Sequence, residues 1–238
     1  MRYLFTVLLI IHGLLIKAQE VQNPDSVIRG FEKYNKLCPI LGGDSVRYCY
    51  GMKCTGPVTD YYNSGKIKHK GYYDRGQIAS VFNNYFENGN IERAFQAKSE
   101  SRGLITVFYS NGHVKSKGEY VNGKTLKWED FYVDGTLEYS EKFNKNANYH
   151  LYTRFYFPDG NPQILFEIID ARNRIYSYKS YYVNGNIEEQ GFKIQNKSSG
   201  DYVQDGKWQY YSEDGRLILE EDYIKGMLNS EKDFNKSN

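Results

Sequence analysis

The chain of 238 residues is poor in the residues that catalysis and metal binding use most. It has only four histidines, which are His12, His69, His113 and His150. His12 lies in the apolar N-terminal run, and we expect the other three to be exposed. Acidic pairs such as Glu141 with Asp130 fit charged positions on a solvated sheet better than a general acid and base. No phosphate-binding loop, Gly-x-Ser-x-Gly elbow or His-Glu-x-x-His helix occurs. We therefore predict a protein that is not an enzyme and that needs no cofactor and no metal.

Cysteine is also scarce, and its three copies all precede residue 55. They are Cys38, Cys49 and Cys54. Their spacing of eleven and then five residues is not a zinc-ligand pattern. In an exported protein two of them would pair, and Cys49 with Cys54 is the closest pair in sequence. The alternative is that all three are reduced.

Long apolar runs are missing apart from one at the N-terminus. Arg2, the run from Leu4 to Leu15 and a small-residue end at Ala18 have the order of a secretory signal peptide. The run is shorter than the roughly 20 residues that a spanning helix needs. We predict cleavage near Ala18 and export to the periplasm, the outer-membrane surface or the extracellular space. An uncleaved membrane-anchoring helix is the alternative.

An excess of charge of either sign is absent from the chain that follows Ala18. Removing Arg2 and Lys17 reduces the 31 basic residues to 29, which equals the 29 acidic residues. A neutral surface gives little attraction to phosphate or to anionic lipid. This balance predicts no nucleic-acid partner, and it makes membrane lipid an improbable one.

What the chain does contain is a repeat. Seven times an aromatic residue, here called the leading aromatic, stands four positions before a glycine that follows Asn, Asp or Ser. The seven sites are Tyr61 with Gly65, Tyr85 with Gly89, Phe108 with Gly112, Phe131 with Gly135, Tyr156 with Gly160, Tyr181 with Gly185 and Tyr211 with Gly215. The glycines are 24, 23, 23, 25, 25 and 30 residues apart. Such a period indicates a stack of similar units, each of which buries its apolar face against its neighbours.

The dipeptides that end in these glycines, such as Asn88-Gly89, favour two-residue hairpins with a type I′ turn. Counting outward from such a turn pairs the residue after the leading aromatic with an aliphatic residue, as in Tyr132 with Leu137. It pairs the leading aromatic itself with a residue that is often charged, as in Phe131 with Glu138. We therefore predict one apolar, more buried face and one face on which aromatic rings alternate with charged side chains.

At this point the chain resembles the MORN-repeat family, particularly its bacterial variant. The best copies are Gly206-Lys207-Trp208-Gln209-Tyr210-Tyr211-Ser212-Glu213-Asp214-Gly215-Arg216-Leu217 and Tyr181-Tyr182-Val183-Asn184-Gly185-Asn186-Ile187-Glu188. The predicted fold is all-β, an elongated single-sheet antiparallel meander of stacked hairpins. The predicted organisation is a signal peptide at 1–18, a cysteine-bearing lead-in at 19–57, seven repeats at 58–228 and a tail at 229–238.

The resemblance implies a scaffold that binds a protein partner, in the cell envelope or outside the cell. The candidate binding face is formed by the five central leading aromatics, Tyr85, Phe108, Phe131, Tyr156 and Tyr181. An antitoxin or immunity-type protein is the alternative that the bacterial variant suggests by family association. Glycan binding is another alternative, although the chain has only two tryptophans, Trp128 and Trp208. Oligomeric state stays open.

Overall fold

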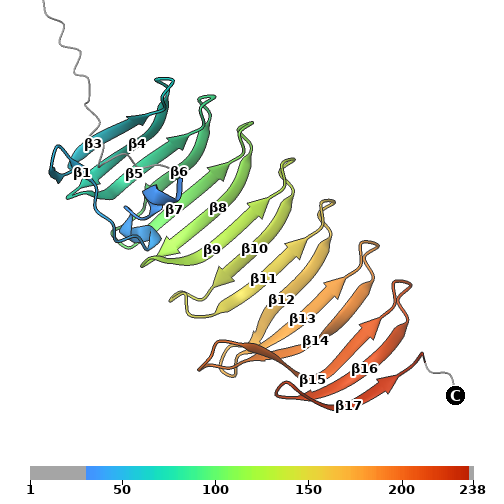
Figure 1. Ribbon diagram of the computed structural model, residues 1–238. Coiled ribbons are helices and arrows are strands. Elements are labelled where there is room, and N and C mark those ends of the chain that lie inside the picture. Colours follow the sequence, from blue (N-terminus) through green and yellow to red (C-terminus); the bar gives the residue numbers. More distant parts are fainter. Residues whose placement is uncertain (1–30, 236–238) are drawn as a thin grey trace, which may run out of the picture.

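The computed structural model describes residues 31–235, so the predicted signal peptide lies outside the described residues. Fifteen strands form one open antiparallel sheet in which every strand pairs with the next in sequence (Figure 1). The predicted all-β elongated meander is therefore confirmed. The strands are β3 (Gly56–Tyr61), β4 (Ile67–Asp74), β5 (Gln77–Tyr85), β6 (Ile91–Ala97), β7 (Arg102–Phe108), β8 (Val114–Val121), β9 (Lys124–Phe131), β10 (Leu137–Phe143), β11 (His150–Tyr156), β12 (Pro162–Asp170), β13 (Ile175–Tyr181), β14 (Ile187–Gln195), β15 (Tyr202–Tyr211), β16 (Leu217–Ile224) and β17 (Met227–Asp233). Strand β17 continues the sheet past residue 228. Among residues 31–235, no helix is long and apolar enough to cross a membrane.

The lead-in folds onto the sheet instead of extending it. Its described part contains α1 (Phe31–Asn35), the 3-10 helix η2 (Pro39–Leu41) and a small hairpin of β1 (Tyr48–Cys49) and β2 (Met52–Lys53). Cys49 and Cys54 form a disulfide, and Cys38 is free and buried. Figure 1 shows the two short helices lying in front of one face of the sheet near β6 to β9.

The hairpin turns of the repeat differ from the predicted type I′. Each of the seven turn glycines has a positive φ between 81° and 96°, whereas the residue before it does not. Gly135 donates its N–H to the Tyr132 carbonyl, and Tyr132 donates its own to the Thr136 carbonyl. This geometry is a three-residue loop, a type I turn followed by a left-handed glycine.

The Asn or Asp before the glycine has a different role from the predicted one. Its side-chain oxygen accepts the backbone N–H of the residue after the glycine, as in Asn88 to Asn90 and Asp134 to Thr136, both at 2.9 Å. In these dipeptides the Asn or Asp side chain caps the turn by a hydrogen bond, and only the glycine needs the left-handed conformation.

The longer loop shifts the register at the turn by one residue. Leading aromatics pair with the aliphatic residues, as in Phe131 with Leu137 and Tyr181 with Ile187, and a bulge follows. Both predicted pairings, that of Tyr132 with Leu137 and that of Phe131 with Glu138, are therefore wrong. The Lys115 ammonium instead lies 5.7 Å from the centroid of the Tyr109 ring, and Glu188 accepts a hydrogen bond from Ser180.

Type I′ turns do occur, but at the opposite end of the strands. Arg75-Gly76, Asn122-Gly123 and Lys225-Gly226 each have two consecutive positive φ angles. These turns close the hairpins between repeats. The two ends of the sheet therefore use two different turn chemistries.

The two faces of the sheet differ in chemistry. The face that the lead-in touches, here called the lead-in face, contains buried Phe82, Phe95 and Ile105, which pack against Ile40 of the lead-in. The other face, here called the charged face, has ion pairs along its length. These are Arg102–Glu119, Lys127–Glu129, Arg154–Glu167 and Lys207–Glu220. Apolar packing therefore concentrates on the lead-in face.

Candidate binding face

A single row of side chains runs across the lead-in face and defines its chemistry. Each repeat contributes the residue five before its glycine and the residue four after it, and these two pair across the hairpin. The row reads Asp60, His69, Asn84, Arg93, Val107, Ser116, Asp130, Tyr139, Phe155, Ile164, Ser180, Glu189, Tyr210 and Leu219. We call it the central row.

The lead-in binds the first members of this row through a buried ion pair. Both terminal nitrogens of Arg47 donate to Asp60, at 2.8 and 2.5 Å, and the Tyr34 hydroxyl donates to the same carboxylate at 2.8 Å. Burial acts to raise the pKa of Asp60, but the hydrogen bonds and charge of Arg47 outweigh it and hold that pKa below its usual range. Asp60 therefore stays ionised under the lead-in.

His69 is buried, so the expectation that it is exposed is wrong. The Tyr34 ring stacks on it with centroids 4.0 Å apart. Its Nδ1 lies 2.7 Å from Asn84 Oδ1, and its Nε2 lies 3.0 Å from the Tyr73 hydroxyl, so a neutral ring can donate to Asn84 and accept from Tyr73. Burial lowers the pKa of His69 to about 4. His113 is exposed as expected, and His150 is half-buried.

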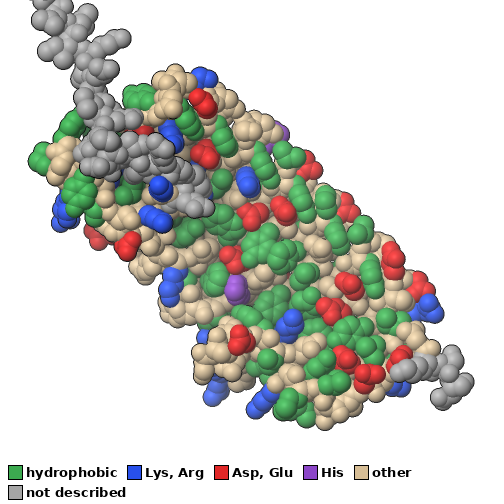
Figure 2. Space-filling model, in the orientation of Figure 1, with side chains coloured by type: hydrophobic (Ala, Val, Ile, Leu, Met, Phe, Trp, Pro, Cys, Tyr) green, Lys and Arg blue, Asp and Glu red, His purple; other side chains and the backbone are tan. Residues whose placement is uncertain are grey.

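The covered region ends in the middle of the sheet. Arg93 of the second repeat still donates to Asn35 of the lead-in at 2.7 Å, and η2 contacts β7, β8 and β9. In Figure 1 the strands from β10 to β17 lie beyond the lead-in. Figure 2 shows hydrophobic side chains gathered over this part of the same face, with Asp and Glu side chains among them.

Two grooves open on this face near the three-residue loops, and they occupy equivalent positions two repeats apart. The middle groove has a volume of about 530 Å³ and includes Asp130, Glu138 and Tyr139. The distal groove has a volume of about 560 Å³ and includes Ser180, Glu188 and Glu189. Equivalent positions in two repeats therefore form similar grooves that are lined by different side chains.

The two grooves differ in how their carboxylates are satisfied. In the middle groove, Asp130 accepts hydrogen bonds from Ser116 at 2.6 Å and from the Trp128 indole at 2.8 Å. Lys115 also lines that groove. The distal groove has no Lys, Arg or His among its lining residues.

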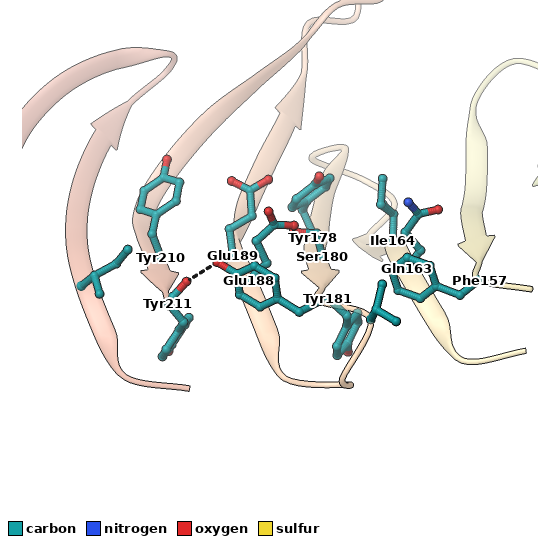
Figure 3. A pocket seen from close by; sticks show the side chains of 13 residues that line it. Phe157, Gln163, Ile164, Tyr178, Ser180, Tyr181, Glu188, Glu189, Tyr210 and Tyr211 are labelled. Atoms are coloured by element: carbon teal, nitrogen blue, oxygen red, sulfur yellow. Dashed lines mark hydrogen bonds between the residues drawn. The ribbon is translucent and has the colours of Figure 1, made fainter. Parts of the chain in front are cut away.

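Figure 3 shows how the side chains of the distal groove lie. Glu188, Glu189, Tyr178 and Tyr210 extend to one side of the strands, whereas the rings of Tyr181 and Tyr211 extend to the other. Burial and the neighbouring Glu189 raise the pKa of Tyr178 to about 12. The negative charge of Glu189 therefore disfavours ionisation of the neighbouring Tyr178 hydroxyl.

In four repeats a tyrosine that follows the leading aromatic links that repeat to the next one. Four tyrosine hydroxyls donate to the backbone carbonyl of the leading aromatic one repeat further on, at 2.6 to 2.9 Å. The pairs are Tyr62 with Tyr85, Tyr109 with Phe131, Tyr132 with Tyr156 and Tyr182 with Tyr211. These contacts are structural, because they hold the stack of hairpins together.

The structure places the five predicted ring residues at the ends of alternate strands. Tyr85, Phe108, Phe131, Tyr156 and Tyr181 end β5, β7, β9, β11 and β13 and are half-buried, as is the aromatic residue that follows each of them. The leading aromatics and the residues that follow them therefore do not show the predicted contrast in burial. Lys117 lies over the Phe131 ring on the charged face, 5.4 Å from the ring centroid.

Sequence reasoning missed the central row by one residue on each strand. The two-residue turn selected the residues four before and three after each glycine. The central row instead consists of the residues five before and four after it. Reading the repeat as a three-residue loop with a bulge would have identified it. Among residues 31–235, no group of three or more His, Cys, Asp or Glu side chains is placed to hold a metal ion.

Three stretches of the chain match the MORN repeat variant, at residues 55–75, 102–122 and 204–225. Each stretch spans one hairpin, β3–β4, β7–β8 or β15–β16. No curated protein matches the chain.

Similarity to solved structures is weak. TarM of S. aureus is 13% identical with a TM-score of 0.28, covering 48% of this chain and 20% of TarM. The TcdB2-TccC3 structure is 12% identical with a TM-score of 0.19, covering 71% of this chain and 10% of that one. The chain thus spans a fifth or less of these proteins, and no functional argument rests on them.

Proposed function

Because the chain contains repeats of the MORN variant, we propose that it is an exported, non-catalytic scaffold that binds a protein partner through its lead-in face. The carrying observation is that one sheet face is covered by the chain's own lead-in over the first repeats and open over the later ones. An open apolar face with polar groups at its grooves is typical of an interaction surface.

Two observations support export. The N-terminal run up to Ala18 has the order of a signal peptide, and Cys49 and Cys54 are joined by a disulfide of the kind that persists in oxidising compartments. The buried Cys38 thiol, whose pKa burial raises to about 11, is unreactive toward exchange.

Site-specific photocross-linking in the native host tests the proposal. A photoreactive phenylalanine analogue replaces Tyr178 on the lead-in face, and the matched control carries it at Val81, which is exposed on the charged face. We expect a discrete cross-linked protein from the Tyr178 position, in an exported fraction, and none from Val81. Equal cross-linking from both positions would contradict a partner on the lead-in face.

The same experiment separates the antitoxin alternative. A chain that keeps Met1 to Ala18 and cross-links to a cytosolic protein would replace the exported scaffold with a cytosolic antitoxin. Intact mass of the protein from the host reports whether cleavage occurs near Ala18.

A further inference from the structure

The lead-in shows what kind of segment this sheet face accepts. It places an arginine, Arg47, on the Asp60 carboxylate and a stacked ring, Tyr34, over the next residue of the central row, His69. Apolar Ile40 fills the space over the strands that follow. An irregular segment with a cation, a ring and an apolar anchor therefore already covers one half of the face.

The distal groove offers the same types of contact without an occupant from the described chain. Glu189 occupies the central row, as Asp60 does, and Glu188 lies beside it. Within the part of the chain that the structure describes, neither carboxylate takes part in an ion pair, and Glu188 accepts one hydrogen bond, from Ser180 at 3.0 Å. The Lys193 ammonium lies nearby, 4.4 Å from the centroid of the Tyr178 ring. Tyr178 and Tyr210 supply rings on either side of the two carboxylates (Figure 3).

We propose that the distal groove binds an extended segment of the protein partner that carries an arginine or lysine next to an aromatic residue. The cation lies between Glu188 and Glu189, and the aromatic residue packs against Tyr210, because the Lys193 ammonium already lies over the Tyr178 ring. This inference rests on the proposed scaffold function and adds the chemistry of the partner.

Charge decides between this partner and the others. Two carboxylates line the groove against one neighbouring ammonium, that of Lys193 over the Tyr178 ring, so the balance of charge stays negative. A negative groove repels anionic lipid and nucleic acid and attracts a basic segment. In the middle groove, Lys115 is a lining residue together with Glu138, and Asp130 already accepts two hydrogen bonds. The distal groove is therefore the stronger site for a cation.

A peptide selection with the full chain tests the inference. The probe is a displayed library of random 12-residue peptides, followed by affinity measurements on the selected sequences. We expect enrichment of Arg or Lys beside Tyr, Phe or Trp, and weaker binding at higher salt. The double variant Glu188→Gln, Glu189→Gln should weaken the selected peptides at least tenfold.

Two controls separate the site from general acidity. Glu220→Gln removes a carboxylate from the charged face, and Glu138→Gln removes one from the middle groove. Both should change affinity less than twofold. Unchanged circular dichroism and thermal midpoint of the double variant show that it is folded.

Each other outcome overturns the inference. Selection of no peptide, selection of peptides without a cation, or binding that survives the double variant removes the basic segment from the distal groove. Binding of the full chain to an array of neutral glycans, lost on Glu189→Gln, would replace the peptide with a sugar. Cross-linking of a protein at Tyr178 would still support the scaffold in the first three cases.

Discussion

The first two repeats and the sixth and seventh repeats have the same backbone but bury their lead-in face by different means. In the first two, the central row is polar and buried, with His69 and Asn84 at 0% and 2% exposure. The lead-in supplies polar and ring contacts that offset the cost of this burial, because a buried polar group needs a hydrogen bond. In the later repeats Trp208 is the local cover, lying over Gly191 and donating to the Phe192 carbonyl at 3.0 Å. The comparison teaches that one repeat unit supports either a covered core or an open groove.

The largest effect should come from removing the ion pair of the covered region. Arg47→Ala leaves Asp60 buried without its cation, and loss of one partner of a buried pair costs about 3–5 kcal/mol. Urea unfolding measures it. Lys207→Ala breaks the exposed pair with Glu220 and should leave stability nearly unchanged. If the two variants lose the same stability, the lead-in is not what stabilises the first repeats.

Acidification should destabilise the covered region selectively. The pKa of His69 is lowered from 6.5 to about 4, so between these values the unfolded chain binds a proton that the folded chain does not. Stability is full above pH 6.5 and falls by about 3 kcal/mol as pH decreases towards 4.

Unfolding followed by fluorescence can separate the two regions. Trp128 lies near the covered core and Trp208 in the open repeats, so each single-tryptophan variant reports one region. His69→Gln should flatten the pH dependence seen by Trp128. An unchanged slope in that variant would assign the effect to another group.

Adding a methyl group beneath each tryptophan compares how the two regions pack. An added Cβ at Gly191 would clash with Cδ2 and Cε2, the two atoms shared by the rings of the Trp208 indole, whereas one at Gly118 would meet the outer ring of Trp128 at 2.5 Å. Gly191→Ala and Gly118→Ala should each cost about 1–3 kcal/mol in thermal or urea unfolding. Gly191→Ala should cost more, because the middle of the indole can move aside less than its outer ring can. The reverse order would show that the lead-in makes the covered side the stiffer one.

The smallest effect should be equal in both regions. Asn88 and Asn184 make the same two contacts, accepting the N–H two residues on and donating to a carbonyl of the next repeat. Alanine at either position should cost about 1 kcal/mol, measured by chemical denaturation. A clear difference between the two would mean that the lead-in affects even the far turns.

Much of the fold could be predicted from the sequence, because it is local. The spacing of Tyr85 from Gly89 and its six counterparts implied one hairpin per repeat and a meander. The turn type could not be chosen, since Asn-Gly and Asp-Gly occur in two-residue loops and also as side-chain caps of three-residue loops. Because of that ambiguity Glu138 was expected to pair with Phe131, whereas Phe131 pairs with Leu137.

The candidate site was less accessible to prediction than the fold. The five ring residues from Tyr85 to Tyr181 were chosen from the repeat alone, and their role in binding stays a prediction. The distal groove depends on pairing across β12 to β15, which brings Ile164, Ser180, Glu189 and Tyr210 into one row. No segment of the sequence contains that juxtaposition.

The sequence by itself determined the number of hairpins, the glycines that close them and the membership in a repeat architecture, because these follow from contacts between residues close in the chain. Only the tertiary structure decided which sheet face is covered and where the cover ends. Those features depend on Arg47 reaching Asp60 and Asn35 reaching Arg93, 58 positions along the chain. The described part of the lead-in reaches as far as β9, because its contacts depend on where residues 31–57 fold back onto the sheet.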